Sequence, residues 1–446
     1  MSPSKRLELN RRLLVAMNLL REEQLEQADL ALSAILTQWP GEPNALHFQG
    51  ILRHTQGRSA EGVALIRKAL ELTPKEPGMW NNLGNVLVES QQLDEAVEAY
   101  RASIAAAPGQ VATADALNNL GTLLRRQLDW TGAEKAHRDA LSLRPDFVDG
   151  WYNLSLALLG QGRVAEGLEA NSRAIALSPR DMQPRNQVIR ALVMLGEREQ
   201  AAQLYREWLE EEPGNPVAQH QLAACLGQDS PARASDAYVE EVFDTFATSF
   251  DVKLEMLGYR APSLVAEALH QAAGEPAAAL DICDAGCGTG LCGPLLRPWA
   301  RRLAGCDLSV GMLRQAKPRA CYDALHKAEL VYYLQTQPGA YDAVVSADTL
   351  CYFGPLEQVA NAAVASLRPG GWLIFTVEAL PDGSTDPHQL QTSGRYAHEA
   401  SYLRRALTAA GFQEPVLQHD RLRLEGGKAV MGWLVTAQRP VSGGPA

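Results

Sequence analysis

The sequence has 446 residues, which is long enough for two or three domains with cores of their own. Apolar residues make up 46% and charged residues 21%, which is typical of a soluble globular protein and excludes collagen-like and wholly disordered chains. The 52 acidic and 41 basic side chains give a formal charge of −11, so we expect no binding to nucleic acid and none to an anionic membrane.

Residues 1–12 contain no apolar signal-peptide core, and no later stretch approaches the roughly 18 consecutive apolar residues of a membrane span. We therefore expect a cytoplasmic protein without a membrane segment. The seven cysteines are expected to be free thiols. Cys283, Cys287 and Cys292 lie close together, but their spacing lacks a CxxC pattern and a nearby histidine, so we predict no metal site.

A period of about 34 residues runs through the N-terminal half, and a period of this length is typical of two short helices and a turn. Prolines mark it at Pro40, Pro74, Pro108, Pro145, Pro179 and Pro213. Within one unit, Trp80 and Gly84 belong to the first helix, and Ala96 and Tyr100 belong to the second. These positions resemble the tetratricopeptide (TPR) repeat, which implies an all-α superhelix with a concave surface that binds extended peptides. Six units are predicted, over residues 9–42, 43–76, 77–110, 114–147, 148–181 and 182–215.

One polar position recurs in three successive units. Asn82, Asn119 and Asn153 each stand directly before a leucine of the first helix. A column of carboxamides on the concave face can donate and accept hydrogen bonds along a peptide backbone, so we predict that these asparagines bind a peptide or protein partner. The alternative is that asparagine is a solvated residue there. Separately, the exposed repeats offer a surface for a homodimer.

The join between the two halves is predicted near residue 228. An apolar helix over 217–226 is expected to cap the repeats, and a break follows at 227–231. The next helix carries Phe243, Phe246 and Phe250, which either pack on the following domain or close over a ligand as a lid. The predicted division is a repeat domain over 1–228, a second domain over 229–440 and a disordered tail over 441–446.

From residue 280 onwards, short apolar runs alternate with helical segments, which predicts an α/β domain with a doubly wound parallel sheet. The expected strands are 280–284, 302–307, 341–346 and 372–377, followed by an antiparallel hairpin over 422–425 and 429–435. Ligands of such sheets bind beyond the carboxyl ends of the strands, so the residues there are the candidates for a site.

A glycine loop follows the first of these strands, with the sequence Asp284-Ala-Gly286-Cys-Gly288-Thr-Gly290. Alternate glycines permit a tight turn and let the backbone approach a ligand. Asp307 ends the next strand, where an acid chelates the ribose hydroxyls of an adenosine. A nicotinamide dinucleotide favours the spacing GxGxxG, and its diphosphate would be repelled by Asp284, whereas the cation S-adenosylmethionine suits that carboxylate.

With Met312, Tyr341-Asp342 and the stretch 367–371, these features resemble a class I S-adenosylmethionine-dependent methyltransferase of Rossmann-like fold, over residues 236–440. The resemblance implies that Asp307 binds the ribose, that Glu329 lies near the adenine amine, and that Asp348 faces the methionine end and the acceptor. The cofactor-binding residues that it implies are Asp284, Gly286, Gly288, Gly290, Asp307, Leu308, Met312, Glu329, Leu330 and Asp348.

No general base is evident in the sequence. The polar segment 388–402 offers His388, Tyr396 and His398 as catalytic candidates and Arg395 as a substrate contact, with ordinary loop polarity as the alternative.

The whole chain resembles bacterial TPR-fused methyltransferases, which implies that the repeats recruit a peptide or protein substrate. Two alternatives stay open. One is a small-molecule methyltransferase whose repeats serve oligomerisation or partner docking, and the other is a scaffold that binds the cofactor without catalysis.

Overall fold

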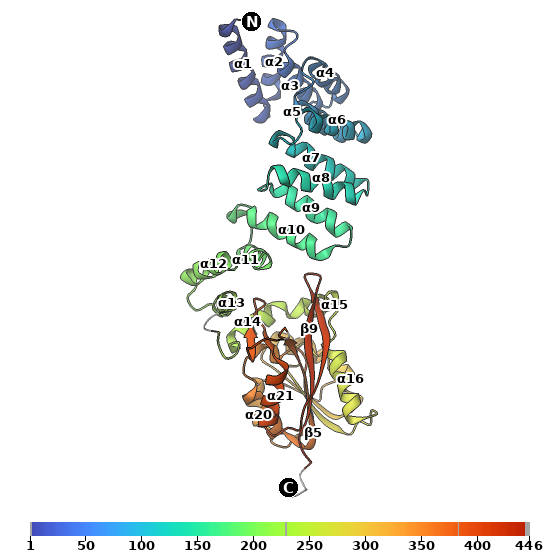
Figure 1. Ribbon diagram of the computed structural model, residues 1–446, viewed down its shortest axis with the longest axis vertical. Coiled ribbons are helices and arrows are strands. Elements are labelled where there is room, and N and C mark those ends of the chain that lie inside the picture. The colour runs from blue at the N-terminus through green and yellow to red at the C-terminus, as the bar shows by residue number, and fades with distance from the viewer. Residues whose placement is uncertain (1, 228–229, 382, 442–446) are drawn as a thin grey trace. The chain divides into compact units, whose positions relative to one another are not determined.

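The computed structural model consists of helices in its N-terminal part and a mixed α/β sheet in its C-terminal part (Figure 1). It describes residues 2–227, 230–381 and 383–441, so the predicted tail, apart from Val441, lies outside the described residues. The chain divides into two compact units, Met1–Ala191 and Leu192–Ala446. Among the described helices, none is long and apolar enough to cross a membrane.

Paired helices make up the first unit, and consecutive pairs are in contact (Figure 1). Their bounds are α1 (Pro3–Arg21), α2 (Leu25–Gln38), α3 (Pro43–Thr55), α4 (Ser59–Leu72), α5 (Pro77–Glu89), α6 (Leu93–Ala106), η1 (Val111–Thr113), α7 (Ala114–Arg126), α8 (Trp130–Leu143), α9 (Val148–Gly160), α10 (Val164–Leu177) and η2 (Arg180–Met182). These pairs coincide with the predicted repeats, so the repeat architecture is confirmed. The three residues between the third and fourth repeats form η1.

Small residues let the helices of each pair approach closely. Gly84 of α5 faces the ring of Tyr100 on α6, which is 3% exposed, and a β-carbon at Gly84 would overlap that ring. Gly121 of α7 faces His137 of α8 in the same way. The apolar side chains between the pairs form continuous buried clusters, which is how a repeat array without a central core is stabilised.

Helix α11 (Arg185–Met194) spans the division between the units, and α12 (Arg198–Glu211) and α13 (Pro216–Leu226) belong to the second unit. Pro216 begins α13 behind its cap, Asn215, and Gly227 ends the helix with φ +65°. The structural division therefore precedes the predicted boundary at residue 228, because α13 contacts both α12 and α14 (Asp236–Phe246).

The second unit is built on one sheet with the strand order β3-β2-β1-β4-β5-β7-β6. The strands are β1 (Leu280–Ala285), β2 (Ala300–Asp307), β3 (Ala324–Lys327), β4 (Tyr341–Ser346), β5 (Leu367–Ala379), β6 (His388–Leu390), β7 (Tyr396–His398), β8 (Val416–Glu425) and β9 (Lys428–Gln438). Strands β1 to β5 pair in parallel, and β9 pairs antiparallel with both β5 and β8. The strand order reverses between β1 and β4, so the predicted doubly wound α/β fold is confirmed.

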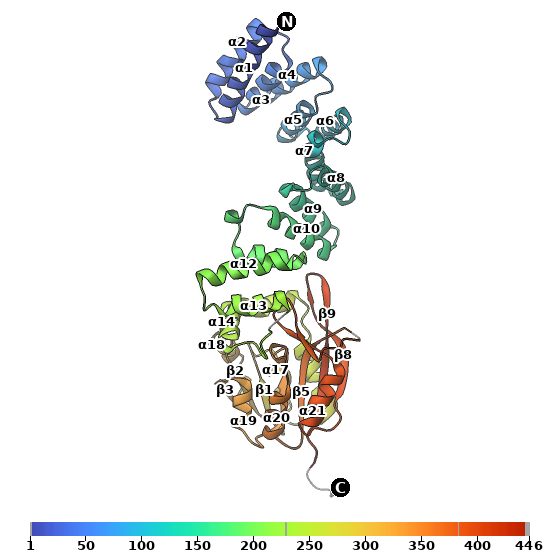
Figure 2. The same cartoon turned by 60° about the vertical axis from the view of Figure 1, so that its left-hand side comes forward.

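Helices cover both faces of this sheet (Figure 2). One buried cluster joins the sheet to α16 (Ala261–Ala273) and α17 (Gly293–Leu296), and the other joins it to α19 (Leu330–Gln335), α20 (Glu357–Ser366) and α21 (Ala400–Ala409). The remaining short helices are η3 (Ala247–Ser249), α15 (Phe250–Met256), α18 (Val310–Ala316), η4 (Lys317–Arg319) and η5 (Leu350–Tyr352).

The structure adds strands that the sequence pattern did not indicate. The segment 388–402, read as a polar loop, contains the short strands β6 and β7 at one edge of the sheet. A β-bulge between Arg421 and Arg423 interrupts the register of β8 against β9. As a result, the buried side chains of Leu422 and Arg423 are adjacent on a strand that would otherwise alternate.

Candidate functional site

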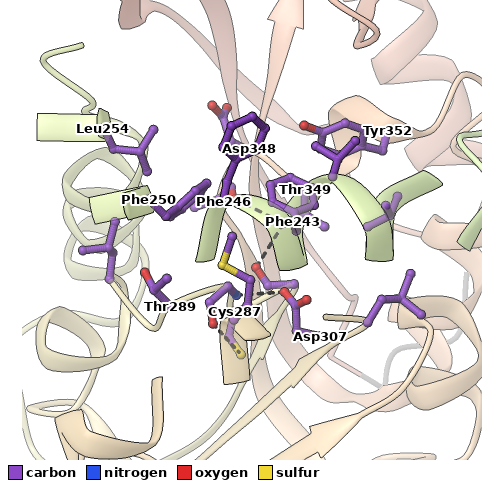
Figure 3. Close-up of a pocket in the computed structure, with 18 of the residues that line it drawn as sticks. Phe243, Phe246, Phe250, Leu254, Cys287, Thr289, Asp307, Asp348, Thr349 and Tyr352 are labelled. Carbon is purple, nitrogen blue, oxygen red and sulfur yellow. Dashed lines mark hydrogen bonds between the residues drawn. The ribbon is translucent and has the colours of Figure 1, made fainter. Parts of the chain in front are cut away.

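A cavity of about 320 Å³ lies at the carboxyl ends of β1, β2 and β4, where the strand order reverses. Side chains and backbone from the loops after these strands form its floor, and residues of α14 and α15 form its cover (Figure 3). Open α/β sheets bind their ligands at this position. Eight of the ten predicted cofactor-binding residues line the cavity, namely Gly286, Gly288, Asp307, Leu308, Met312, Glu329, Leu330 and Asp348.

The glycine loop is anchored to the neighbouring strand. The backbone N–H groups of Gly286 and Cys287 both donate to the carbonyl of Cys306, at 2.8 and 3.0 Å. Gly286 has φ +78° and packs against Thr349, so a β-carbon there would collide. Gly288 has φ +52°, and a β-carbon there would meet no protein atom within 4 Å. Gly286 is therefore required by packing, whereas Gly288 stands beside open space.

Asp307 joins the glycine loop to the start of α18. Its Oδ2 accepts the N–H of Gly288 at 2.9 Å, and its Oδ1 accepts the N–H of Ser309 at 2.8 Å. Burial raises the pKa of Asp307, and the backbone N–H groups oppose that rise. Leu308 and the buried Met312 continue the same wall of the cavity.

Asp284 and Gly290 do not line the cavity, in contrast to the contacts that the resemblance implies. Asp284 is 1% exposed, and the hydroxyl of Tyr322 donates to its Oδ2 at 2.6 Å. Burial raises the pKa of Asp284 to about 7, and its Oδ1 has no hydrogen-bond partner. A β-carbon on Gly290 would lie 2.9 Å from the ring of Tyr322. Both residues therefore contact Tyr322 rather than the cavity.

Glu329 presents an unpartnered acceptor at the other end of the floor. Its Oε2 caps α19 by accepting the N–H of Tyr332 at 2.8 Å. Its Oε1 is buried without a hydrogen-bond partner, and the residue lines the cavity between Ala328 and Leu330. A buried carboxylate oxygen without a donor is costly, so this atom is suited to an incoming N–H group.

A network of buried ionisable side chains borders the cavity beyond β4. Arg423 is 3% exposed, and its Nη1 contacts Asp348 at 2.6 Å while its Nε contacts Glu425 at 2.8 Å. Arg423 also pairs with Glu378. Arg395 contacts Glu378 at 2.6 Å and pairs with Glu425 as well.

Three carboxylates thus surround two guanidinium groups, which leaves one excess negative charge when all five side chains are ionised. Burial raises the pKa of Asp348 despite the opposing effect of Arg423. Asp348 also has a positive φ of +52°, and its N–H donates to the hydroxyl of Thr376 at 2.9 Å, which fixes this unusual backbone.

Aromatic side chains of α14 and α15 cover the cavity. Phe243, Phe246 and Phe250 all line it, and the ring of Phe243 lies edge-on to Tyr352 at 5.5 Å between centroids (Figure 3). The packing of these rings on the domain is confirmed, whereas their closure over a ligand as a lid stays a prediction.

Two aspartates fasten this cover to the floor. Asp244 of α14 accepts hydrogen bonds from the hydroxyl of Ser309 and, at 2.9 Å, from the N–H of Gly311. Asp251 of α15 accepts from the hydroxyl of Thr289 at 2.5 Å and pairs with Arg319. The cover is therefore tied at one end to α18 and at the other to the glycine loop.

The three catalytic candidates do not line the cavity. His388, Tyr396 and His398 pack with Tyr402 in an aromatic cluster near the sheet edge. His398 is fully buried, and its Nε2 donates to the carbonyl of Gly354 at 2.9 Å. Arg395, the fourth candidate of that segment, does line the cavity. Of the four candidates in this segment, Arg395 alone lines this cavity, and its contact with a substrate stays a prediction.

The three asparagines of the repeats bond to neighbouring repeats. The side-chain N–H₂ of Asn82 lies 3.0 Å from Nε2 of His47, and that of Asn153 donates to Asn118 at 3.1 Å. The side-chain N–H₂ of Asn119 donates to the side-chain oxygens of both Asn81 and Asn85, each at 3.1 Å. All three are half-buried. Their amides therefore link successive repeats, and their role toward a peptide stays a prediction.

Family models match both parts of the chain. The tetratricopeptide repeat matches residues 14–77, 76–146 and 118–181, and a methyltransferase domain matches residues 283–373. The chain combines tetratricopeptide repeats with a methyltransferase domain. The matched part of that domain extends from β1 to β5 and so includes the floor of the cavity.

Relatives and solved structures share parts of the chain. Methyltransferase-like protein 27 of Homo sapiens is 35% identical over 30% of this chain and 55% of its own length. Malonyl-[acyl-carrier protein] O-methyltransferase of Acetivibrio thermocellus is 36% identical over 22% of this chain and 35% of its own length. A putative S-adenosylmethionine-dependent methyltransferase from Listeria monocytogenes aligns with a TM-score of 0.32 and 18% identity, over 40% of this chain and 99% of that structure. The chain thus spans about half, or less, of the first two relatives.

The sequence pattern did not single out Arg423, Glu425 and Tyr259, all of which line the cavity of the methyltransferase domain. Burial and the nearby Asp348 raise the pKa of Tyr259. The irregularity between Arg421 and Arg423 shifts the register of the closing hairpin, and both Leu422 and Arg423 are buried. All seven cysteines are free thiols, and no group of three or more potential ligands for a metal occurs within residues 2–227, 230–381 and 383–441.

Proposed function

We propose that this protein is an S-adenosylmethionine-dependent methyltransferase whose repeats recruit a peptide or protein substrate. The observation that carries the cofactor assignment is the polar pattern of the cavity floor. Asp307 stands at its centre, the unpartnered Oε1 of Glu329 at one end and the Asp348 network at the other.

The residues present fit this cofactor. The free oxygen of Glu329 can accept a hydrogen bond from an exocyclic amine, and the carboxylate of Asp307 can accept from two vicinal hydroxyls. The open space beside Gly288 admits a ligand against the backbone. The excess negative charge around Asp348 suits a cationic group at the far end.

When bound, S-adenosylmethionine supplies a methyl group activated by the positive sulfonium. The residues of this chain then act mainly by positioning, which can account for much of a rate enhancement. Asp307 and Glu329 fix the nucleoside end, and the rings of Phe243 and Phe250 exclude water from the cavity. Asp348, Glu425 and Tyr259 are ionisable side chains of the cavity wall. Burial raises the pKa of Tyr259, which therefore keeps its proton, so a proton released by the acceptor would pass to Asp348 or Glu425.

The repeats support a polypeptide as the substrate, since such arrays generally mediate protein and peptide interactions. The alternative of a small-molecule acceptor, with repeats used for assembly or docking, draws support from the enclosing aromatic cover of α14 and α15. The two proposals differ in where the transferred methyl group ends up.

Binding of S-adenosylhomocysteine, measured by titration calorimetry, tests the cofactor assignment. We expect the wild-type protein to bind and Asp307→Ala to lose at least about tenfold in affinity, since hydrogen bonds to a charged group contribute roughly 1.5 to 3 kcal/mol. Asp323→Ala is the matched control, because Asp323 also accepts a backbone N–H, from Leu303 at 2.7 Å, but lies outside the cavity. Absence of binding by the wild type at millimolar ligand would refute the proposal.

Methyl-labelled S-adenosylmethionine added to the protein and a host lysate identifies the acceptor class. Label in a discrete protein band, absent with Asp307→Ala, supports the polypeptide substrate. Label confined to the small-molecule fraction contradicts it and supports the alternative. Binding of S-adenosylhomocysteine without any transfer would instead support a scaffold.

A further inference from the structure

The helix that follows the repeats packs against the methyltransferase domain. Helix α13 contacts the turn between β6 and β7, and its Ala224 is buried with Leu390 and Tyr396. The hydroxyl of Tyr396 also donates to the carbonyl of Pro231 in the segment after α13. All of these residues belong to the second compact unit. The end of α13 is therefore part of the interior of this unit.

His220 makes the central contact. Its side chain is 5% exposed, and its Nε2–H donates to the carbonyl of Gly394 at 2.8 Å. Its ring also packs on the ring of Tyr238, at 4.1 Å between centroids. The neighbouring Gln221 donates to the hydroxyl of Tyr238 at 2.9 Å. Helix α13 and the start of α14 thus hold the turn together.

Gly394 packs so closely on α13 and α14 that it leaves no room for a side chain. It has φ +81°, and a β-carbon there would lie 2.5 Å from Nε2 of Gln221 and 2.7 Å from the hydroxyl of Tyr238. Within the turn, the N–H of Gln391 donates to the carbonyl of Arg395 at 2.8 Å, and the N–H of Gly394 donates to that of Gln391 at 2.9 Å. The turn therefore has its own hydrogen bonds on one side and the α13 contacts on the other.

The residue after Gly394 is Arg395, which lines the cavity and pairs with Glu378 and Glu425. A second contact reaches the same wall, because the segment 232–234 pairs with residues 352–354. The N–H of Ala234 donates to the carbonyl of Tyr352 at 2.8 Å, and that of Gly354 donates to the carbonyl of Ala232 at 2.9 Å. Tyr352 and Phe353 also line the cavity. Two parts of the cavity wall, Arg395 and the pair Tyr352 and Phe353, are thus adjacent to segments that α13 and residues 232–234 contact.

We infer that α13 positions Arg395 for the acceptor, with His220 as the positioning residue. The part of this inference that concerns methyl transfer rests on the proposed function. The geometric part stands independently, since the contacts join His220, Gly394 and Arg395 whatever the ligand is. The floor that would hold the cofactor, from Gly286 to Asp307, makes no part of these contacts. Loosening α13 should therefore affect the acceptor side and leave cofactor binding unchanged.

Full-length variants at His220 test the inference. His220→Leu removes the donor at similar volume, whereas His220→Gln keeps an N–H near the position of Nε2. Hydrogen exchange at the amides of residues 391–395, affinity for S-adenosylhomocysteine, and methyl transfer to lysate acceptors are measured for each. We expect His220→Leu to raise exchange in the turn and to lower transfer, each at least tenfold, with the affinity within twofold of wild type. His220→Gln should restore both to within about threefold.

Gly394→Ala should disturb the β6–β7 turn directly, and Gly411→Ala is its control. Gly411 also has a positive φ, of +99°, but a β-carbon there would meet no atom within 4 Å. Only Gly394→Ala should reduce transfer.

Two results would overturn the inference. One is unchanged exchange at 391–395 in His220→Leu and Gly394→Ala, and the other is raised exchange with full transfer. Failure of the proposed function has a different signature, which is no binding of S-adenosylhomocysteine by the wild type.

Discussion

Gly84 and Gly121 of the first unit lie where two helices meet, whereas Gly288 after β1 lies where the chain turns beside a cavity. A β-carbon on Gly121 would lie 2.7 Å from a ring carbon of His137, and one on Gly84 would overlap Tyr100. One on Gly288 would meet nothing within 4 Å. The same residue type therefore marks helix contact in the repeats and room for a ligand in the methyltransferase domain. Substitutions that separate stability from binding can test this difference.

The largest effect is expected from the buried charges of the second unit, which contrast with the apolar helix contacts of the repeats. Arg423→Met removes a shared partner of Asp348, Glu378 and Glu425 and leaves these three carboxylates with Arg395 as the remaining cation of the network. We expect the free energy of unfolding of this unit to fall by about 3 to 5 kcal/mol. Urea unfolding measures the loss. Arg421→Met, at an exposed position of the same strand, is the control and should change it by less than about 0.5 kcal/mol.

In the repeats, Gly84→Ala should destabilise by about 1 to 3 kcal/mol, because the ring of Tyr100 must move out of a packed position. The urea midpoint of the first unit should fall, and the affinity for S-adenosylhomocysteine should stay within twofold of wild type. Gly78→Ala, at the start of the same helix with nothing within 4 Å, should be neutral or slightly stabilising. Equal losses of stability in Gly84→Ala and Gly78→Ala would contradict a packing role for Gly84.

In the glycine loop, the opposite pattern is expected. Gly288→Ala places a methyl group in the open space beside the backbone, so affinity for S-adenosylhomocysteine should fall at least about tenfold. The urea midpoint should change no more than in Gly339→Ala, where the glycine has a similar φ of +59° and nothing within 4 Å of a β-carbon. Retained affinity in Gly288→Ala would show that the open space is not where the ligand lies.

Buried histidines make the repeats sensitive to acid. Burial lowers the pKa of both His47 and His137 to about 4, below the ordinary value of 6.5. The unfolded chain then binds protons between pH 6.5 and 4 that the folded chain does not, so stability falls as the pH decreases through this window. At pH 5.5 the expected loss is about 1 kcal/mol for each histidine relative to pH 7.5. The pH dependence of the urea midpoint measures it, and His137→Gln should reduce the slope.

The smallest expected effect concerns the asparagines. Asn119→Ala removes one half-buried donor shared by two acceptors, which should cost about 0.5 kcal/mol. Asn44→Ala, at an exposed position, should cost less. If a peptide partner is found, its affinity for Asn119→Ala decides whether the column also binds peptides, because an unchanged affinity would contradict that prediction.

Periodicity predicted most of the fold. The 34-residue period fixes the helix pairs, since each pair must present the same faces to its neighbours, and even the three inserted residues appear as η1. The glycine loop and Asp307 were predictable because both are local features at strand ends. Arg423 was not, since its partners Asp348 and Glu378 are distant from it in the sequence and meet it only in the folded sheet. The sequence could not indicate that His398 lies away from the cavity, because its burial and the hydrogen bond of its Nε2 to the carbonyl of Gly354 arise only in the fold.

The contact of α13 with the β6–β7 turn has a consequence for engineering. Exchange of the repeats for another binding module is a natural way to redirect such an enzyme, and the sequence suggests a junction at the break near residue 228. A junction there would remove His220 and Gln221 and leave the turn that carries Arg395 unsupported. A chimera with an intact catalytic part should instead be joined ahead of Leu192, where the second compact unit begins.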